Sequence, residues 1–385
     1  MNKKLLRECM KLIIWGVATA ILFNGCKQAQ KVADVLTKPT PRELYARQFE
    51  NDTSMYNAWE NVFENALKDS VQIQLPYSES GVFFAENIEA YSYDLTLERG
   101  EIFHVEVLTD SIPVFIDVYK RTSDSTLTFS HFARNESGQN ILNKTIEKTG
   151  SYKVILQAGI RSQANFDFDL YSTPSYSFPV LGKDNQAIQS FWGADREGGR
   201  RTHQGVDIFA DRGTPVIAVT QGRVSSTGNR GLGGKQVWLK SGLLGNSLYY
   251  AHLDSVLVQT GKRVQIGDTL GLVGNTGNAR TTAPHLHFGI YERFRGAIDP
   301  LPFIRINDRF KTDLEMLSLQ SPKISVSAAM ANLRQSPSVQ SKKIGTVKRG
   351  DTLSILGVTD KWIHINTKRI GKAFVHKSLV NLESG

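Results

Sequence analysis

Short runs of alternating apolar and polar residues, separated by Gly, Ser and Asn, recur through most of this chain. Between residues 71 and 175 they include YSYDLTL, IFHVEV, VFIDVYK, SYKVILQA and NFDFDLY. Alternation with a period of two buries one face of each strand, and regularly spaced turn signals favour a β-sandwich. Residues 178–305 are rich in Gly and in β-forming residues, so they predict a second, mostly antiparallel β domain.

Two further blocks flank these β domains. Residues 42–70 place Trp59, Val62, Phe63, Ala66 and Leu67 at spacings of three and four, which predicts an amphipathic helix with one buried face. Residues 324–382 again show short β runs, and a linker at 306–323 contains DRFKTDLEMLSLQ, which has a helical pattern. The predicted fold class is therefore mainly β, and 385 residues are enough for several domains with separate cores.

The first 25 residues predict an export signal. Lys3, Lys4, Arg7 and Lys11 precede an apolar stretch that is too short to span a bilayer comfortably, although an uncleaved anchor is the alternative. The stretch ends in LFNGC, which resembles the lipobox of bacterial lipoproteins, although its Phe and Asn depart from the usual residues.

That resemblance implies a lipid on Cys26, followed by a tether at 26–41. It also implies attachment to a membrane of the cell envelope, which we expect to be the periplasmic side of the outer membrane. Cleavage before Cys26 would remove Cys9, the other cysteine of the chain, so no disulfide is expected.

Charge is distributed unevenly along the chain. Residues 26–177 carry 14 basic and 21 acidic side chains, residues 178–305 carry 15 and 9, and residues 322–385 carry 11 and 3. Basic modules suggest polyanionic partners. For an exported protein we expect an anionic cell wall or lipid surface, and no nucleic acid.

The most informative histidines lie in TTAPHLHFGI. Residues two apart on a strand share a face, so His285 and His287 point to the same side. His203, His252 and Asp207 belong to the same predicted domain. A zinc hydrolase needs three N or O ligands and one open position, which this set can supply. Hydrogen-bonded structural histidines are the alternative.

The other four histidines are given no functional role. His104 and His131 lie in the predicted sandwich without clustered partners and are interpreted as structural. His364 and His376 are interpreted as surface or strand residues of the last block.

Three motifs of the domain at 178–305, namely HQGVDIFADRGTPVIAVTQGRV, YYAHL and TAPHLHFGI, resemble the lysostaphin-like (LytM-type) zinc metallopeptidases of peptidoglycan. The resemblance implies that His203, Asp207 and His287 bind Zn²⁺ and that His252 and His285 are the catalytic pair. Gly289 stands where many members carry Glu, and NARTTAP before the first motif histidine is slightly longer than usual.

The last block resembles bacterial SH3-like domains, which are small barrels found beside wall hydrolases. The resemblance rests on Leu333-Arg334, the Gly350-Asp351 turn, Trp362 and the closing AFVH. It implies binding of wall peptides, with a purely structural barrel as the alternative.

The predicted sandwich resembles pre-peptidase modules of secreted bacterial proteases by its pattern alone.

Two glycine-containing runs of the domain at 178–305 have competing interpretations. GNRGLGGK (228–235) lacks the features of a phosphate-binding loop and is expected to be a mobile surface loop beside the cleft. GKRVQIGDTLGLVGNTG resembles half of a lipoyl carrier but lacks a lysine at the expected hairpin tip, so it is taken as β framework.

Together these features predict a zinc-dependent endopeptidase that hydrolyses peptide cross-links of peptidoglycan. Its expected partners are the stem peptides of the wall and a membrane, reached through the lipid anchor. The alternatives are a catalytically silent wall-binding protein that activates an amidase, and a general protein endopeptidase. The bond that is cleaved stays open between D-alanyl-diaminopimelate cross-links and glycine bridges.

Overall fold

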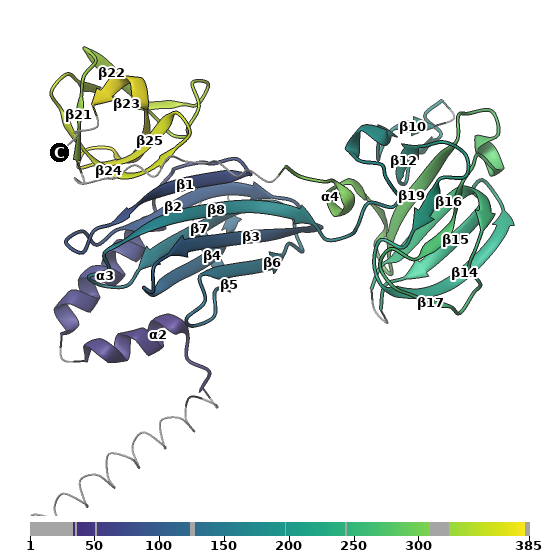
Figure 1. Ribbon diagram of the computed structural model, residues 1–385, viewed down its shortest axis with the longest axis horizontal. Helices are drawn as coiled ribbons and strands as arrows, with labels where there is room; N and C mark the ends of the chain where they lie inside the picture. The colour runs from purple at the N-terminus through teal and green to yellow at the C-terminus, as the bar shows by residue number, and fades with distance from the viewer. Residues whose placement is uncertain are drawn as a thin grey trace, which may run out of the picture. The chain divides into compact units, whose positions relative to one another are not determined.

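The computed structural model shows a chain built mostly from antiparallel β-strands, which confirms the predicted fold class (Figure 1). The structure describes residues 34, 37–50, 52–123, 128–196, 198–242, 245–308 and 323–381. The predicted signal with Cys26, most of the tether at 26–41 and the helical pattern of the linker lie outside the described residues. In the described part, no helix is long and apolar enough to cross a membrane.

Residues 1–60 and 61–385 are separate compact units. The first contains α2 (Pro41–Ala46) and η1 (Arg47–Phe49), and the boundary between the units falls within α3 (Thr53–Ala66). The segment at 42–70 is thus not one continuous helix. Thr40 and Glu43 form a capping box that starts α2, and Asp52 accepts a hydrogen bond from the backbone N–H of Met55 at the start of α3.

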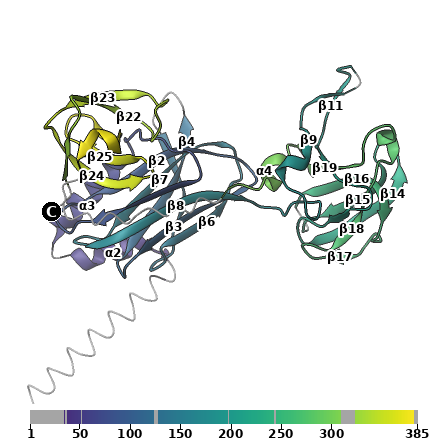
Figure 2. The ribbon, with the colours of Figure 1, turned by 45° about the horizontal axis from the view of Figure 1, so that its top comes forward.

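Eight strands form two stacked antiparallel sheets, which we call the sandwich (Figures 1 and 2). One sheet has the order β1 (Tyr77–Phe83), β8 (Ala164–Pro174), β3 (Glu101–Thr109) and β6 (Ile141–Thr145). The other has the order β2 (Ala90–Leu97), β7 (Gly150–Ala158), β4 (Val114–Ser123) and β5 (Thr128–Arg134). Alternate residues of the strands fill the core between the sheets, as in β3, where Phe103 and Val105 are fully buried.

A second β domain, which we call the middle domain, follows the sandwich. Its main sheet has the order β17 (Arg263–Val264), β14 (Gly222–Arg230), β15 (Gly234–Lys240), β16 (Ser247–Val256), β19 (His285–Glu292), β12 (Val206–Phe209) and β9 (Ile188–Ser190). β13 (Pro215–Ile217), β18 (Thr269–Val273) and β20 (Gly296–Ile298) pair beside it, and η2 (Asn185–Ala187), η3 (Gly277–Ala279) and α4 (Leu301–Ile304) complete the domain. The hairpin of β10 (Asp195–Arg196) and β11 (Arg201–Thr202) projects from this domain in Figure 2.

The glycine-rich run at 228–235 is a tight β-hairpin rather than a loose loop. It spans the end of β14 and the start of β15. A Cβ on Gly234 would lie 2.4 Å from the backbone nitrogen of Gly277, and the φ of Gly234 is +60°, so only glycine fits there without strain. Gly233 and Gly234 are buried, whereas residues 229–232 at the tip are exposed, in agreement with the expected surface position.

The last domain, the barrel, contains β21 (Lys323–Val326), β22 (Met330–Arg334), β23 (Lys343–Lys348), β24 (Thr352–Thr359), β25 (Trp362–Thr367), β26 (Gly371–His376), η4 (Lys377–Leu379) and β27 (Val380–Asn381). Its strand β24 pairs with β1 of the sandwich through Ser80 and Val358, so one sheet continues through both. Leu356, Trp362 and Phe374 of the barrel belong to the hydrophobic core of the sandwich. Sandwich and barrel are therefore joined, although the middle domain separates them in the sequence.

Candidate metal centre

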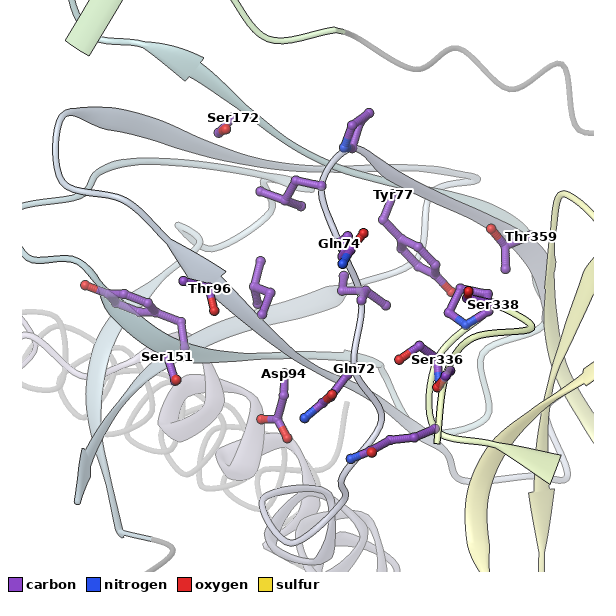
Figure 3. A pocket seen from close by; sticks show the side chains of 18 of the residues that line it. Gln72, Gln74, Tyr77, Asp94, Thr96, Ser151, Ser172, Ser336, Ser338 and Thr359 are labelled. Carbon is purple, nitrogen blue, oxygen red and sulfur yellow. The ribbon is translucent and has the colours of Figure 1, made fainter. Parts of the chain in front are cut away.

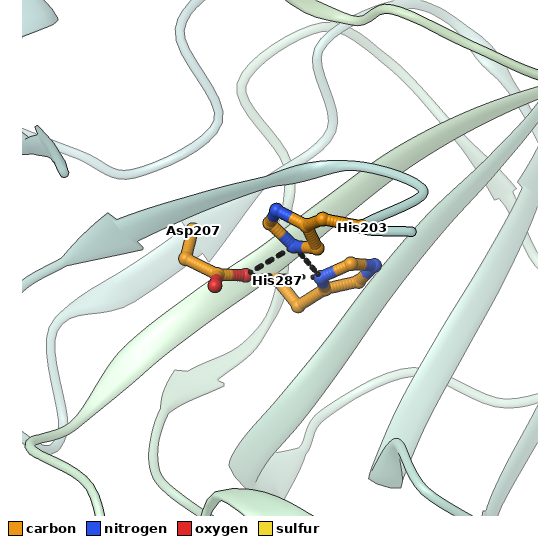
Figure 4. Close-up of side chains that lie close together, drawn as sticks. All are labelled: His203, Asp207 and His287. Carbon is orange, nitrogen blue, oxygen red and sulfur yellow. Dashed lines mark hydrogen bonds and ion pairs between the residues drawn. The ribbon is translucent and has the colours of Figure 1, made fainter. Parts of the chain in front are cut away.

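Three of the predicted site residues converge in the middle domain (Figure 4). Asp207 on β12 and His287 on β19 are directly opposite in the antiparallel register, so their side chains lie on the same face. His203 follows the β10–β11 hairpin and reaches the pair from the side. Among the described residues, this is the one group of three or more His, Cys, Asp or Glu side chains close enough to share a metal ion.

The donor atoms of this group fit zinc. Oδ1 of Asp207 lies 3.0 Å from Nε2 of His203 and 3.0 Å from Nδ1 of His287, and the two nitrogens are also 3.0 Å apart. Tetrahedral zinc with ligand bonds of about 2.0 Å holds its ligands about 3.3 Å apart. Two imidazoles and one carboxylate leave one position open, which is the donor set of a catalytic zinc site.

Gly205 makes room for this arrangement. A Cβ at that position would lie 2.7 Å from Cε1 and 2.8 Å from Nε2 of His287, and 2.5 Å from the carbonyl oxygen of Phe288. Any side chain there would displace the His287 ring or the strand that carries it. The glycine between His203 and Asp207 is therefore a steric requirement of the site.

Neighbouring groups fix the orientation of the donors. His203 donates from Nδ1 to the carbonyl oxygen of Phe191 at 2.9 Å, which leaves Nε2 as the atom with a lone pair. Arg196 on β10 donates to Oδ2 of Asp207 at 3.0 Å, so the carboxylate presents Oδ1 to the imidazoles. The sequence did not point to Arg196, because no spacing rule links it to Asp207.

The charges at the centre favour metal binding. Burial alone would raise the pKa of Asp207, but the close contacts with His203 and His287 outweigh burial and hold it well below the ordinary value. Burial lowers the pKa of His287, against the opposing effect of Asp207. An ionised carboxylate beside a neutral imidazole is the protonation state that a metal ion requires.

His252 and His285 lie next to the three donors without joining them. The ring centroid of His252 is 5.0 Å from that of His285 and 5.9 Å from that of His287. His252 donates from Nδ1 to the carbonyl oxygen of Thr276 at 2.9 Å, and His285 donates from Nδ1 to that of Ala283 at 2.8 Å. These contacts leave Nε2 as the ring nitrogen of each histidine that can accept a proton.

His252 occupies an unusual backbone conformation. Its φ is +63°, a region that residues other than glycine rarely adopt. A hydrogen bond from its backbone N–H to the carbonyl oxygen of Gly233, 2.8 Å long, ties it to the glycine hairpin. Such strain persists where the surroundings over-determine it, and it concentrates at functional sites. Burial, followed by the neighbouring His285 and His287, lowers the pKa of His252 to about 4.

The remaining histidines contact structural partners. On β3, His104 contacts the side chains of Asn143 and Thr173, and on β5 His131 pairs with Asp117. His376 caps η4 through Ser378. His364 is a fully buried residue of strand β25, in agreement with its interpretation as a strand residue of the last block, and it pairs with Glu79 of the sandwich at 3.0 Å.

Comparisons with known proteins agree with the position of this centre. Residues 201–300 match the model of peptidase family M23, and residues 328–381 match that of the bacterial SH3 domain. The chain therefore contains an M23 peptidase domain and a C-terminal SH3 domain. Family M23 includes zinc metallopeptidases, and the His/Asp/His group lies within the matched residues.

Several characterised relatives share this region. An L-Ala–D-Glu endopeptidase of Bacillus subtilis is 34% identical over 148 residues, which is 35% of this chain and 45% of that protein. Lysostaphin of Staphylococcus simulans is 39% identical over 108 residues, 27% of this chain and 21% of that protein. The murein hydrolase activator NlpD of Escherichia coli is 31% identical over 191 residues, 47% of this chain and 46% of that protein. The chain thus spans less than half the length of these relatives.

Proposed function

We propose that this chain, as a carrier of an M23 peptidase domain, is a zinc-dependent endopeptidase that hydrolyses peptide cross-links of peptidoglycan. The observation that carries the proposal is the convergence of two imidazoles and one carboxylate on one point, with two further histidines beside it. Relatives named as an L-Ala–D-Glu endopeptidase and as a peptidoglycan DD-endopeptidase support a peptide substrate in peptidoglycan.

His203, Asp207 and His287 would hold the metal. A zinc ion in this position supplies a Lewis acid for the scissile carbonyl and lowers the pKa of a water to about 7. Arg196 keeps the carboxylate turned toward the two imidazoles. The donors are largely buried, which strengthens their electrostatic interactions.

His252 and His285 would handle the protons of the reaction. Each fixes its Nδ1 on a backbone carbonyl, so each offers Nε2 as a general base or, once protonated, as a general acid. The low pKa of His252 keeps it neutral at pH 7, in the form that accepts a proton. The histidine that has accepted a proton can then donate it to the leaving amine. The other histidine can stabilise the charge that develops on the carbonyl oxygen.

The test is mass spectrometry of the muropeptides released when the full-length chain is incubated with purified cross-linked sacculi. Conversion of cross-linked dimers into monomers, abolished by a chelator and restored by Zn²⁺, is the expected result. The masses of the products identify the bond, either D-alanyl-diaminopimelate or a glycine bridge. Persistence of dimers with zinc bound would overturn the proposal.

A second candidate is a wall-binding activator of an amidase. The similarity to the murein hydrolase activator NlpD covers a larger share of this chain than the similarity to lysostaphin. This chain, however, has a complete set of candidate ligands and both flanking histidines. Stimulation of a purified amidase by the His252→Ala variant, with no cleavage of dimers by the original chain, would favour the activator.

We also propose that Cys26 carries a lipid that attaches the chain to the periplasmic side of the outer membrane. The signal-like segment and the LFNGC sequence support this location. Metabolic labelling with an alkyne fatty acid tests it, because Cys26→Ala should abolish the label and Cys9→Ala should not.

A further inference from the structure

A large cavity lies where the sandwich meets the barrel, apart from the candidate metal centre. It has a volume of about 1130 Å³, and we call it the seam cavity. Its walls include the segment 68–78, residues of strands β2, β4 and β7, the barrel loop 335–341, and residues 305–308. Figure 3 shows amides and hydroxyls directed into it, including Gln72, Gln74 and Ser336.

One wall of the seam cavity is an open strand edge. The backbone of Asp94 on β2 donates to Val71 and accepts from Ile73, which begins a parallel ladder. The next outward-facing residue of β2 is Thr96, because backbone direction alternates along a strand. Among the described residues, the ladder does not continue to Thr96, so its N–H and C=O face the cavity without a backbone partner.

The segment opposite this edge offers more peptide-like groups. Val71 and Ile73 are buried in the sandwich core, whereas Gln72 and Gln74 are exposed and line the cavity. Primary amides carry both donors and acceptors, as peptide groups do. An extended peptide laid along Thr96 would meet main-chain groups on one side and amide side chains on the other.

A positively charged side chain, that of Arg121, also lines the seam cavity. Arg121 on β4 stacks its guanidinium over Phe129 at 6.0 Å, and its buried Nε has no hydrogen-bond partner among the described residues. A buried donor without a partner is costly, and a carboxylate is the acceptor that guanidinium groups bind best. By contrast, Arg305 in the same cavity already pairs with Glu98 and Glu101.

We propose that the seam cavity binds a short extended peptide that ends in a free carboxylate. The peptide backbone pairs with the open edge at Thr96, the amides of Gln72 and Gln74 take its remaining peptide groups, and Arg121 binds its terminal carboxylate. This binding does not require zinc and does not depend on the proposed hydrolysis.

The test is calorimetric titration of the full-length His252→Ala variant, which keeps a bound peptide intact. The probes are N-acetyl-tetra-alanine with a free carboxylate, the same peptide as its amide, and a tetramer of N-acetylglucosamine. We expect the acid to bind about tenfold more tightly than the amide, since one charge-assisted contact is lost. The sugar should not bind.

Arg121→Gln is the decisive variant, because it should bind acid and amide equally. Arg263→Gln, which changes an exposed arginine of the middle domain, should keep the tenfold preference. Thr96→Pro removes only an outward N–H and should weaken both peptides about threefold to tenfold. If that variant does not fold, Gln74→Ala serves the same purpose.

Three results would overturn the proposal. They are binding of the sugar in preference to the peptides, an undiminished acid preference in Arg121→Gln, and absence of peptide binding at about 10 mM, on the scale of weak ligands. Each is independent of whether sacculi are cleaved, so failure here and failure of the endopeptidase proposal are distinguishable.

Discussion

Asp207 and Glu79 are both buried carboxylates that contact histidine nitrogens at 3.0 Å, yet their surroundings differ. Oδ1 of Asp207 lies 3.0 Å from His203 and from His287, and Oε1 of Glu79 lies 3.0 Å from His364. Around Asp207 two imidazole nitrogens converge on one oxygen. Around Glu79 the further donors are the hydroxyls of Tyr77 and of Tyr93, the latter at 2.8 Å.

The comparison distinguishes a carboxylate that pairs with one histidine from a carboxylate on which two histidines converge. Tyrosine hydroxyls satisfy the lone pairs of Glu79 and exclude solvent, so this pair supports the seam between sandwich and barrel. The second histidine at Asp207 instead creates a point that three donor atoms share, with two more imidazoles nearby. A buried histidine–carboxylate pair therefore does not identify a metal site unless a third donor points to the same place.

The largest effect is expected from Asp207→Ala. Removing the oxygen on which both imidazoles converge should reduce bound zinc from about one per chain to near zero and abolish turnover, because two neutral ligands hold the ion weakly. Zinc content by mass spectrometry and cleavage of sacculi measure this. Zinc retained at the original stoichiometry would show that the ligand assignment is wrong.

His252→Ala should lower the rate of hydrolysis without lowering zinc binding. Zinc content should stay unchanged, whereas turnover should fall about 10²- to 10⁴-fold, the usual contribution of a general acid or base. Parallel measurements of zinc content and initial rate decide this. A proportional loss of both would place His252 among the ligands.

Glu79→Leu tests the other carboxylate. It leaves two tyrosine hydroxyls and His364 without their acceptor, so the unfolding free energy of the joined sandwich and barrel should fall by about 3–5 kcal/mol. Denaturant titration of the full-length chain measures the change, with the exposed Glu136→Leu as control. Zinc content should not change, and a loss of zinc would contradict the separation of the two sites.

The zinc-free protein should become less stable in acid because of His252. Its pKa is about 4 in the folded chain, below the ordinary 6.5, so the unfolded chain binds more protons between these values. The stabilisation is complete above about pH 6.5 and is lost as pH falls toward 4, by up to about 3 kcal/mol. Chelator-treated His252→Gln should show a shallower decline, and an identical decline would exclude this cause.

Arg196→Met should have the smallest effect. Without the guanidinium, Oδ2 of Asp207 is free to turn toward the metal, and zinc affinity should fall about 10- to 100-fold, as for other partners of metal ligands. Competition with a fluorescent chelator measures this. An unchanged zinc affinity would show that Arg196 does not orient Asp207 and only stabilises the β10–β11 hairpin.

Features that arise from local periodicity could be predicted from the sequence. The alternation along HLHF predicted a shared face for His285 and His287, and the structure has both on β19. The mainly β fold is confirmed for the same reason. By contrast, Glu79 and His364 are 285 residues apart, and no local pattern records their pairing. The break between α2 and α3 was missed because the helical spacing of 59–67 says nothing about the cap at Asp52.

The pairing of Ser80 with Val358 has a consequence for synthesis of the chain. A ribosome finishes the whole middle domain before it produces the strand that completes the edge of β1. Until then Leu356, Trp362 and Phe374 are missing from the sandwich core, and β1 is an unprotected edge strand. The sandwich therefore has an open edge and an incomplete core until the last domain of the chain has been made.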